Sequence, residues 1–285
     1  GASAIAVLDA AGGVAQIVLL KPGTGYTTPP TVTLSGGGGS GATAVAVKNW
    51  VTMTAPQADP TRDIHVTALL VDEHTLDEVQ FDLTFSQQGR PFWVWGTGIK
   101  PGETTQDFAK DNYYFSFTRL AASGTITIAG TTHEVTGTTW MDHEYGYFGG
   151  SSADARVRWL LQDLQLDNGY SISNAGILTV GYKPEIDVPV DAYATVQDAE
   201  GNLYYVASTI TPVGELWTSP ATGNVYAQQF HVQIPSFQAD LTVSVLVQNQ
   251  EFPIAASPVY EGVAKPTGTM LGKPVTGDAW IEQAY

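Results

Sequence analysis

Residues Thr125 to Gly150 read TITIAGTTHEVTGTTWMDHEYGYFGG. The β-branched residues favour a pleated strand, and the turn at 129–130 divides the stretch into the two strands of a hairpin. Successive side chains of a strand point to opposite faces, so Asp142 and Glu144 share one face of the second strand and His143 takes the other. Asp142 and His143 can therefore enter one cavity only where the strand bulges or ends.

The same hairpin brings acid-base groups together with large rings. Only 14% of the residues are charged, yet Asp142, His143 and Glu144 are consecutive. The flanking aromatic residues are Trp140, Tyr145, Tyr147 and Phe148. Desolvation among rings can move the pKa of a carboxyl group toward neutrality, and that of an imidazole is ordinarily about 6.5, so these groups are candidate general acids or bases. The alternative is a structural network in which Asp142 or His143 binds nearby backbone.

Short alternating segments continue on both sides of the hairpin, which predicts an all-β fold. The segments before it are Ile64 to Val71, Glu78 to Gln87, Pro91 to Gly98 and Asn112 to Ala121. Their spacing is typical of an up-and-down antiparallel barrel. Trp93 and Trp95 share one face of their predicted strand, as do Tyr113, Phe115 and Phe117 of theirs. Such stripes line either a filled core or a ligand cavity.

A second barrel is expected after a break in the pattern at 184–189. Before it, the turn Asp167-Asn168-Gly169 joins 156–166 to a further strand, and we expect these two strands to close the first barrel. The predicted domains are a small Gly-rich β module at 1–48, a linker at 49–63, a first barrel at 64–183 and a second barrel at 184–285.

The first segment of the chain contains a repeat. GASAIAV at Gly1 to Val7 recurs as GATAVAV at Gly41 to Val47. This Gly-rich pattern resembles β repeats of tail-fibre and surface proteins, which stack on their neighbours. We expect an interaction or spacer module here, capable of self-association or of contact with another protein.

Composition excludes several classes of function. A net charge of −16 disfavours nucleic acid as a partner, and no apolar run is long enough to span a membrane. The chain has no cysteine, which excludes disulfides and thiol catalysis. A secreted or periplasmic location is expected, although no signal peptide is present at Gly1 and a cytoplasmic location stays open.

Two further kinds of site are disfavoured. The five histidines lie at 65, 74, 133, 143 and 231 with no close pair at ligand spacing, so no metal is expected. The chain has no Gly-x-Ser-x-Gly elbow, so it is not a serine hydrolase of the usual kind.

The motif GTTWMDHEYG at Gly137 to Gly146 resembles the lipocalin-like hydratase family, which includes carotenoid 1,2-hydratase, the AttH-type proteins called secreted hydrolases, fungal kievitone hydratases and decalin-forming Diels-Alderases. The resemblance covers about Thr61 to Tyr285. The further matching motifs are WLLQDLQLDNGYSI from Trp159, LWTSPATGNVY from Leu216, NQEF from Asn249 and YEGVAKPTGTMLGKPVTGDAWIEQAY from Tyr260. The resemblance implies two packed lipocalin-like barrels.

The resemblance also implies an enzyme that acts on a lipophilic, unsaturated small molecule without a cofactor. Asp142 or His143 would protonate an alkene, aromatic faces would stabilise the cation, and water would add. The catalytic candidates are Asp142, His143, Glu144 and Tyr145. The candidates for substrate binding are Trp140, Trp159, Trp93, Trp95, His65, Tyr113, Glu261 and Glu251.

Alternatives remain for the reaction and for the roles of individual residues. The same cavity could fold a polyene for a Diels-Alder type of cyclisation, in which orientation replaces the acid, or it could bind a lipophilic ligand without reaction. Glu251 and Glu261 either reach the cavity or fix loops by hydrogen bonds. His65 either faces the cavity or is structural, and Glu282 and Trp280 are expected to belong to the closing strand.

Overall fold

The computed structural model describes most of the chain. The described ranges are 1–8, 11–21, 23–35, 43–44, 46, 49–56, 58–59, 62–72, 75–102, 110–147, 157–179, 181–252 and 258–285. Phe148 and most of the second copy of the predicted repeat lie outside them. The described residues form two compact units, one of 1–85 with 122–137 and one of 86–121 with 138–285.

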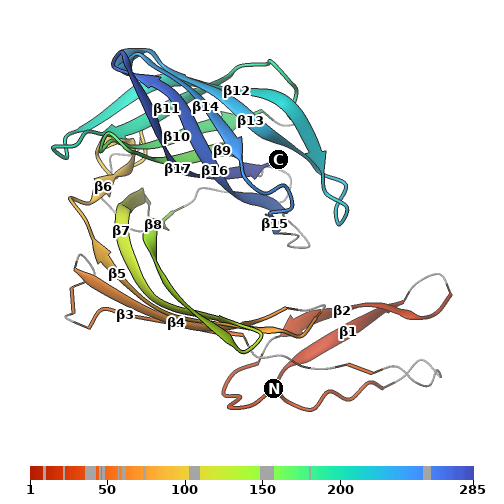
Figure 1. Ribbon diagram of the computed structural model, residues 1–285. Coiled ribbons are helices and arrows are strands. Elements are labelled where there is room, and N and C mark those ends of the chain that lie inside the picture. Colours follow the sequence, from red (N-terminus) through yellow and green to blue (C-terminus); the bar gives the residue numbers. More distant parts are fainter. Residues whose placement is uncertain are drawn as a thin grey trace. The chain divides into compact units, whose positions relative to one another are not determined.

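The second unit contains a closed antiparallel barrel of eight strands (Figure 1). The strands are β9 (Arg158–Leu166), β10 (Ser171–Leu178), β11 (Val190–Gln197), β12 (Leu203–Thr218), β13 (Val225–Ile234), β14 (Ala239–Val245), β16 (Val259–Met270) and β17 (Lys273–Ala284). Pairing of β14 with β16 and of β17 with β9 closes the ring. The two-residue strand β15 (Glu251–Phe252) is added to β16, and the 3₁₀ turn η2 (Pro235–Phe237) precedes β14.

Alternation along these strands fills the barrel with apolar side chains. On β9, Leu160, Leu164 and Leu166 are buried in the main hydrophobic cluster, together with Ile172 of β10 and Ile281 of β17. The odd-numbered residues of β9, such as Asp163 and Gln165, point to the outer face of the barrel. The prediction of an all-β fold with lipocalin-like barrel architecture is confirmed, and the interior of this barrel is a packed core.

A second sheet has the order β3-β4-β5-β7-β6, with β8 paired to β7. Its strands are β3 (Trp50–Thr54), β4 (Asp63–Val71), β5 (Glu78–Gln87), β6 (Phe92–Trp93), β7 (Asn112–Ile128) and β8 (Thr131–Gly146). The turn between β7 and β8 falls at 129–130, as expected from the sequence. The tip of this hairpin, 122–137, belongs to the first unit and its remainder to the second.

The remaining part of the first unit is a two-stranded sheet of β1 (Ser3–Leu8) and β2 (Val14–Lys21). A two-stranded ribbon buries little by itself. Accordingly Ile5, Leu8 and Leu20 are exposed. Among the described residues, no helix is long and apolar enough to cross a membrane.

Two predictions about individual strands were wrong. Strands β9 and β10 do not close a first barrel, because they pair with β17 and β11 in the same closed ring as the strands after residue 184. The predicted strand 91–98 ends after Trp93, because η1 (Val94–Gly96) follows with Trp95 at a φ of 62°. The ends of the predicted domains otherwise stay predictions.

Candidate functional site

The second unit contains a cavity of about 410 Å³ between β8 and the strands β9, β16 and β17. Its lining residues are Thr138, Thr139, Trp140, Asp142, Asp163, Gln165, Val263, Asp278, Ala279, Trp280 and Glu282. Asp163 and Gln165 alternate along β9 with core residues such as Leu164. The cavity therefore lies against the outer face of the barrel, while the interior is filled.

Asp142 is the member of the predicted acidic stretch that lines this cavity. Its Oδ1 accepts a hydrogen bond from the Ser116 hydroxyl and another of 2.6 Å from Trp140 Nε1. Tyr114 also donates to Asp142; burial, the nearby Asp163 and this hydrogen bond raise the pKa of Tyr114. Ser116 and Tyr114 are on β7, the hairpin partner of β8. Neighbouring side chains thus hold the Asp142 carboxylate in place.

Asp163 is the second carboxyl group of the cavity, and only 3% of its surface is exposed. Its pKa lies well above the ordinary value of 3.8, first because of burial and then because of the negative charge of Asp142, while a hydrogen bond from Ser173 opposes the rise. The two carboxyl groups are hydrogen-bonded to each other. Asp163 therefore holds its proton more strongly than an exposed carboxyl group does, because burial and the neighbouring carboxylate both disfavour its charged form.

Glu282 on β17 is another carboxyl group that lines the cavity. Burial and the nearby charge of Glu261 raise its pKa to about 7, although a hydrogen bond from Trp159 opposes the rise. Trp159 Nε1 lies 3.0 Å from Glu282 Oε2. A carboxyl group with a pKa near neutrality can both accept and donate a proton at physiological pH.

Three indole groups hold three carboxylates in this part of the unit. Besides the pairs of Trp140 with Asp142 and Trp159 with Glu282, Trp280 Nε1 donates to Glu261 Oε2 at 2.7 Å. Burial raises the pKa of Glu261. An indole N–H donates but carries no charge, so it orients a carboxylate without neutralising it. This arrangement keeps several acidic groups close together without adding cations.

The carboxyl group of Glu144 lies on the same face of β8 as Asp142 but does not line the cavity. Partial burial raises its pKa, whereas a hydrogen bond from Asn112 and the charge of Lys100 oppose the rise. It adds to the negative field that acts on Glu282.

His143 and Tyr145 lie on the other face of β8, as the alternation predicted. The His143 ring is 5.1 Å from the rings of both Phe115 and Tyr145, between centroids. Tyr113 stacks on Tyr145 at 5.5 Å. The three predicted site residues His143, Tyr145 and Tyr113 thus form an aromatic cluster, and the wall of the cavity contains Asp142 without His143.

Trp93 and Trp95 do not share a face. Trp93 packs on Phe115 at 5.9 Å, whereas Trp95 packs on Tyr114 at 5.7 Å, and these two partners are consecutive on β7 and point to opposite faces. The left-handed backbone of Trp95 redirects its side chain. Its backbone N–H donates to Thr195 Oγ1 at 2.8 Å, so Trp95 supports Tyr114 from the barrel side.

Glu251 is held in a loop network and does not line the cavity. It accepts hydrogen bonds from the hydroxyl groups of Ser219, Thr222 and Tyr226 at 2.5 to 2.7 Å. Burial raises its pKa, but these hydrogen bonds outweigh that effect and lower it. This corresponds to the predicted loop-fixing alternative, although its partners are side chains rather than backbone.

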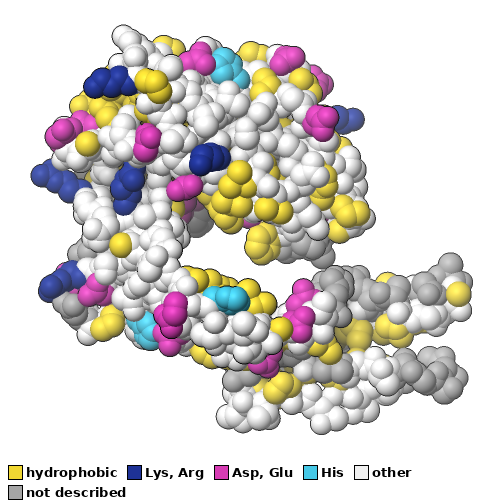
Figure 2. Space-filling model, in the orientation of Figure 1, with side chains coloured by type: hydrophobic (Ala, Val, Ile, Leu, Met, Phe, Trp, Pro, Cys, Tyr) yellow, Lys and Arg dark blue, Asp and Glu magenta, His cyan; other side chains and the backbone are white. Residues whose placement is uncertain are grey.

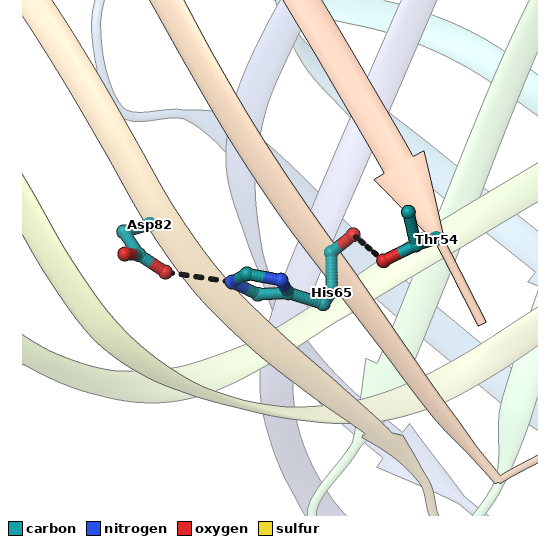
Figure 3. A network of polar contacts seen from close by, with 3 residues as sticks. All are labelled: Thr54, His65 and Asp82. Atoms are coloured by element: carbon teal, nitrogen blue, oxygen red, sulfur yellow. Dashed lines mark hydrogen bonds and ion pairs between the residues drawn. The ribbon is translucent and has the colours of Figure 1, made fainter. Parts of the chain in front are cut away.

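His65 belongs to the first unit. Its Nε2 is 2.7 Å from Asp82 Oδ1, and its carbonyl oxygen accepts a hydrogen bond from Thr54, so three neighbouring strands are joined (Figure 3). Both side chains of the His65–Asp82 pair are exposed. The geometry fits the structural alternative for His65.

Three acidic residues of the cavity, Asp163, Asp278 and Glu282, were missed by the sequence analysis as site residues. Asp163 is the only charged residue between Trp159 and Leu166, and such an isolated carboxyl group within an apolar strand is a signal that could have been used. Glu282 lies on the same face of β17 as Trp280 and was assigned only to the closing strand. Ser116 and Tyr114 gave no signal, because their role depends on the pairing of β7 with β8.

Known proteins share this fold. The AttH-like family model matches residues 32–284. A crystal structure of a protein assigned as AttH from Nitrosomonas europaea has 21% sequence identity and a TM-score of 0.59, over 76% of this chain and 68% of that chain. Kievitone hydratase from Nectria haematococca has 19% identity and a TM-score of 0.62, over 85% of this chain and 70% of that chain. No curated protein sequence matches.

Proposed function

Because the chain belongs to the AttH-like family, and because its cavity combines the buried Asp163, whose pKa is raised, with Glu282, whose pKa is about 7, we propose that it is a hydratase that adds water to a double bond. The name of its structural neighbour kievitone hydratase supports the reaction class. The observation that carries the proposal is the presence of Asp142, Asp163 and Glu282 in one cavity.

The mechanism requires one proton donor and one acceptor. The proton of Asp163, which lies beside Asp142, is transferred to one alkene carbon and leaves a carbocation at the other. Glu282 in its ionised form takes a proton from a water molecule as the water oxygen bonds to the cation. The carboxyl proton given up is thus replaced by one from water, and a proton transfer from Glu282 to the Asp pair restores the site.

The substrate class follows from the walls of the cavity. The faces of Trp140 and Trp280 and the apolar side chain of Val263 complement a hydrocarbon segment, and indole faces stabilise a developing cation by about 0.5 to 2 kcal/mol each. A volume of about 410 Å³ accommodates part of an isoprenoid or polyene. These features support our proposal that the substrate is a lipophilic, unsaturated small molecule.

The test is incubation of the protein with terminally unsaturated isoprenoids and linear polyenes in isotopically labelled water, followed by mass spectrometry. A product heavier by one labelled water is expected. Asp163→Asn should lower its rate by about 100-fold or more, the scale of general acid catalysis. Asp198→Asn is the matched control, because Asp198 holds the turn before β12 through Asn202 and Tyr204. Substrate recovered without labelled product from every compound would contradict the proposal.

A cyclase is the second candidate, since the same walls could fold a polyene into a reactive conformation. An isomer of unchanged mass and altered retention would establish it. Its formation should survive Asp163→Asn, because orientation by Trp140 and Trp280 needs no proton donor. Unchanged substrate that co-elutes with the protein would instead indicate a binding protein.

We also propose that the ribbon of β1 and β2 is an interaction module. Exposed Ile5, Leu8 and Leu20 would be covered by a similar β repeat or another protein. Sedimentation of the chain with and without 1–48 tests this proposal, and identical behaviour of the two at every concentration and with added partner repeats would contradict it.

A further inference from the structure

The cavity differs in charge from the surface of the molecule. Lys and Arg side chains are interspersed with Asp and Glu on the face seen in Figure 2. The cavity wall instead contains the carboxyl groups of Asp142, Asp163, Asp278 and Glu282, and no lining residue is Lys, Arg or His. The carboxyl oxygens of this wall are acceptors that a hydrocarbon segment by itself would leave unused.

An unpartnered oxygen gives a second and independent indication of a ligand. Asp163 is 97% buried, because only 3% of its surface is exposed, and its Oδ1 has no hydrogen-bond partner among the described residues. Buried polar atoms are nearly always satisfied, so an orphaned oxygen in a cavity wall marks a place for a donor or a positive group. The other carboxyl groups reinforce this preference.

The indole groups specify the kind of positive group. Trp140 and Trp280 both line the cavity, and their N–H groups are engaged with Asp142 and Glu261. Aromatic faces beside carboxylates recognise alkylated ammonium ions, whose charge is spread over apolar methyl groups. A metal ion suits the site less well, and among the described residues no group of three His, Cys, Asp or Glu could hold one.

We infer that this cavity binds an organic ammonium ion, with the charged group beside Asp142, Asp163 and Glu282 and the alkyl part against Trp140 and Trp280. The inference rests on the proposed function for the location of the site, because both place a positive centre there, but it does not require the reaction. In hydration the positive centre is transient, whereas an ammonium ion carries it permanently.

Binding should be linked to proton release. The raised pKa of Glu282 reflects burial and neighbouring negative charge, and an ammonium ion would offset the second cause. Bound cation therefore favours the ionised carboxylate, and protons leave the protein as the complex forms near pH 7. Titrations in two buffers with different heats of ionisation measure this release directly.

The experiment compares choline with its neutral isostere 3,3-dimethylbutan-1-ol by calorimetry at pH 7. Choline should bind at least ~10-fold more tightly, since one favourable charge interaction of about 1.4 kcal/mol gives that ratio. Glu282→Gln and Asp142→Asn should each reduce the preference, and Asp198→Asn should leave it unchanged. Two separate variants keep the test informative if one of them fails to fold.

Equal affinities for the two probes, or no binding of either, would overturn the inference. Tighter binding of Ca²⁺ with no effect of choline would also overturn it in favour of a metal site. The two proposals remain separable. A preference for choline without any labelled product would support the ammonium site and contradict the hydratase proposal. Labelled product without a preference for choline would support the hydratase proposal and contradict the ammonium site.

Discussion

Replacing Glu282 by Gln should abolish a decrease with pH in the free energy of unfolding of the second unit, which contains the barrel. Its pKa is raised from 4.5 to about 7 in the folded chain, by burial first and by Glu261 next. The folded state therefore holds the proton more tightly than the unfolded state. The resulting stabilisation is complete below pH 4.5 and is lost as the pH rises through 7.

The size of the effect follows from the two pKa values. A difference of roughly 2.5 between them corresponds to about 3 kcal/mol, at 1.36 kcal/mol for each pH unit. Gln keeps the shape of the side chain and can still accept the hydrogen bond from Trp159. The free energy of unfolding of wild type, relative to Glu282→Gln, should therefore fall by about 3 kcal/mol between pH 4.5 and pH 8.

Urea denaturation at pH 4.5, 6, 7 and 8, followed through the transition of the second unit, measures this difference. Asp198→Asn is the matched control. Hydrogen bonds from Asn202 and Tyr204 outweigh the opposing effect of burial and lower the pKa of Asp198, so it stays ionised over this range. Its substitution should shift stability by a constant amount. Parallel curves for wild type and Glu282→Gln would refute the reasoning about Glu282.

Other consequences follow for activity and stability. The hydration rate should rise with pH as Glu282 ionises near pH 7, and a rate that falls through pH 7 would make Glu282 the acid. Trp159→Phe removes the hydrogen bond that opposes the raised pKa of Glu282, so the rising limb should move to higher pH. His143→Ala should leave the rate unchanged, and a lost rate in a folded variant would return His143 to the mechanism. Leu164→Ala should cost about 2 to 5 kcal/mol in urea unfolding, because Leu164 is completely buried, and a smaller loss would mean that the core collapses around the gap.

Local pattern was sufficient for much of the site. The period of two along β8 separated Asp142 from His143, and the structure has this arrangement. The same rule failed at Trp93 and Trp95, because a left-handed residue between strands breaks the alternation that the rule requires.

The sequence by itself determined the all-β class, most strand positions, the hairpin turn at 129–130 and the faces of β8, because these depend on neighbours in the chain. Only the tertiary structure decided that β9 and β10 belong to the ring closed by β17, since ring closure depends on pairing between distant strands. It also decided the acid-base chemistry. Asp142, Asp163 and Glu282 are far apart in sequence, and the raised pKa values of Asp163 and Glu282 depend on burial and on nearby negative charge, which arise only when the strands that carry them are packed together.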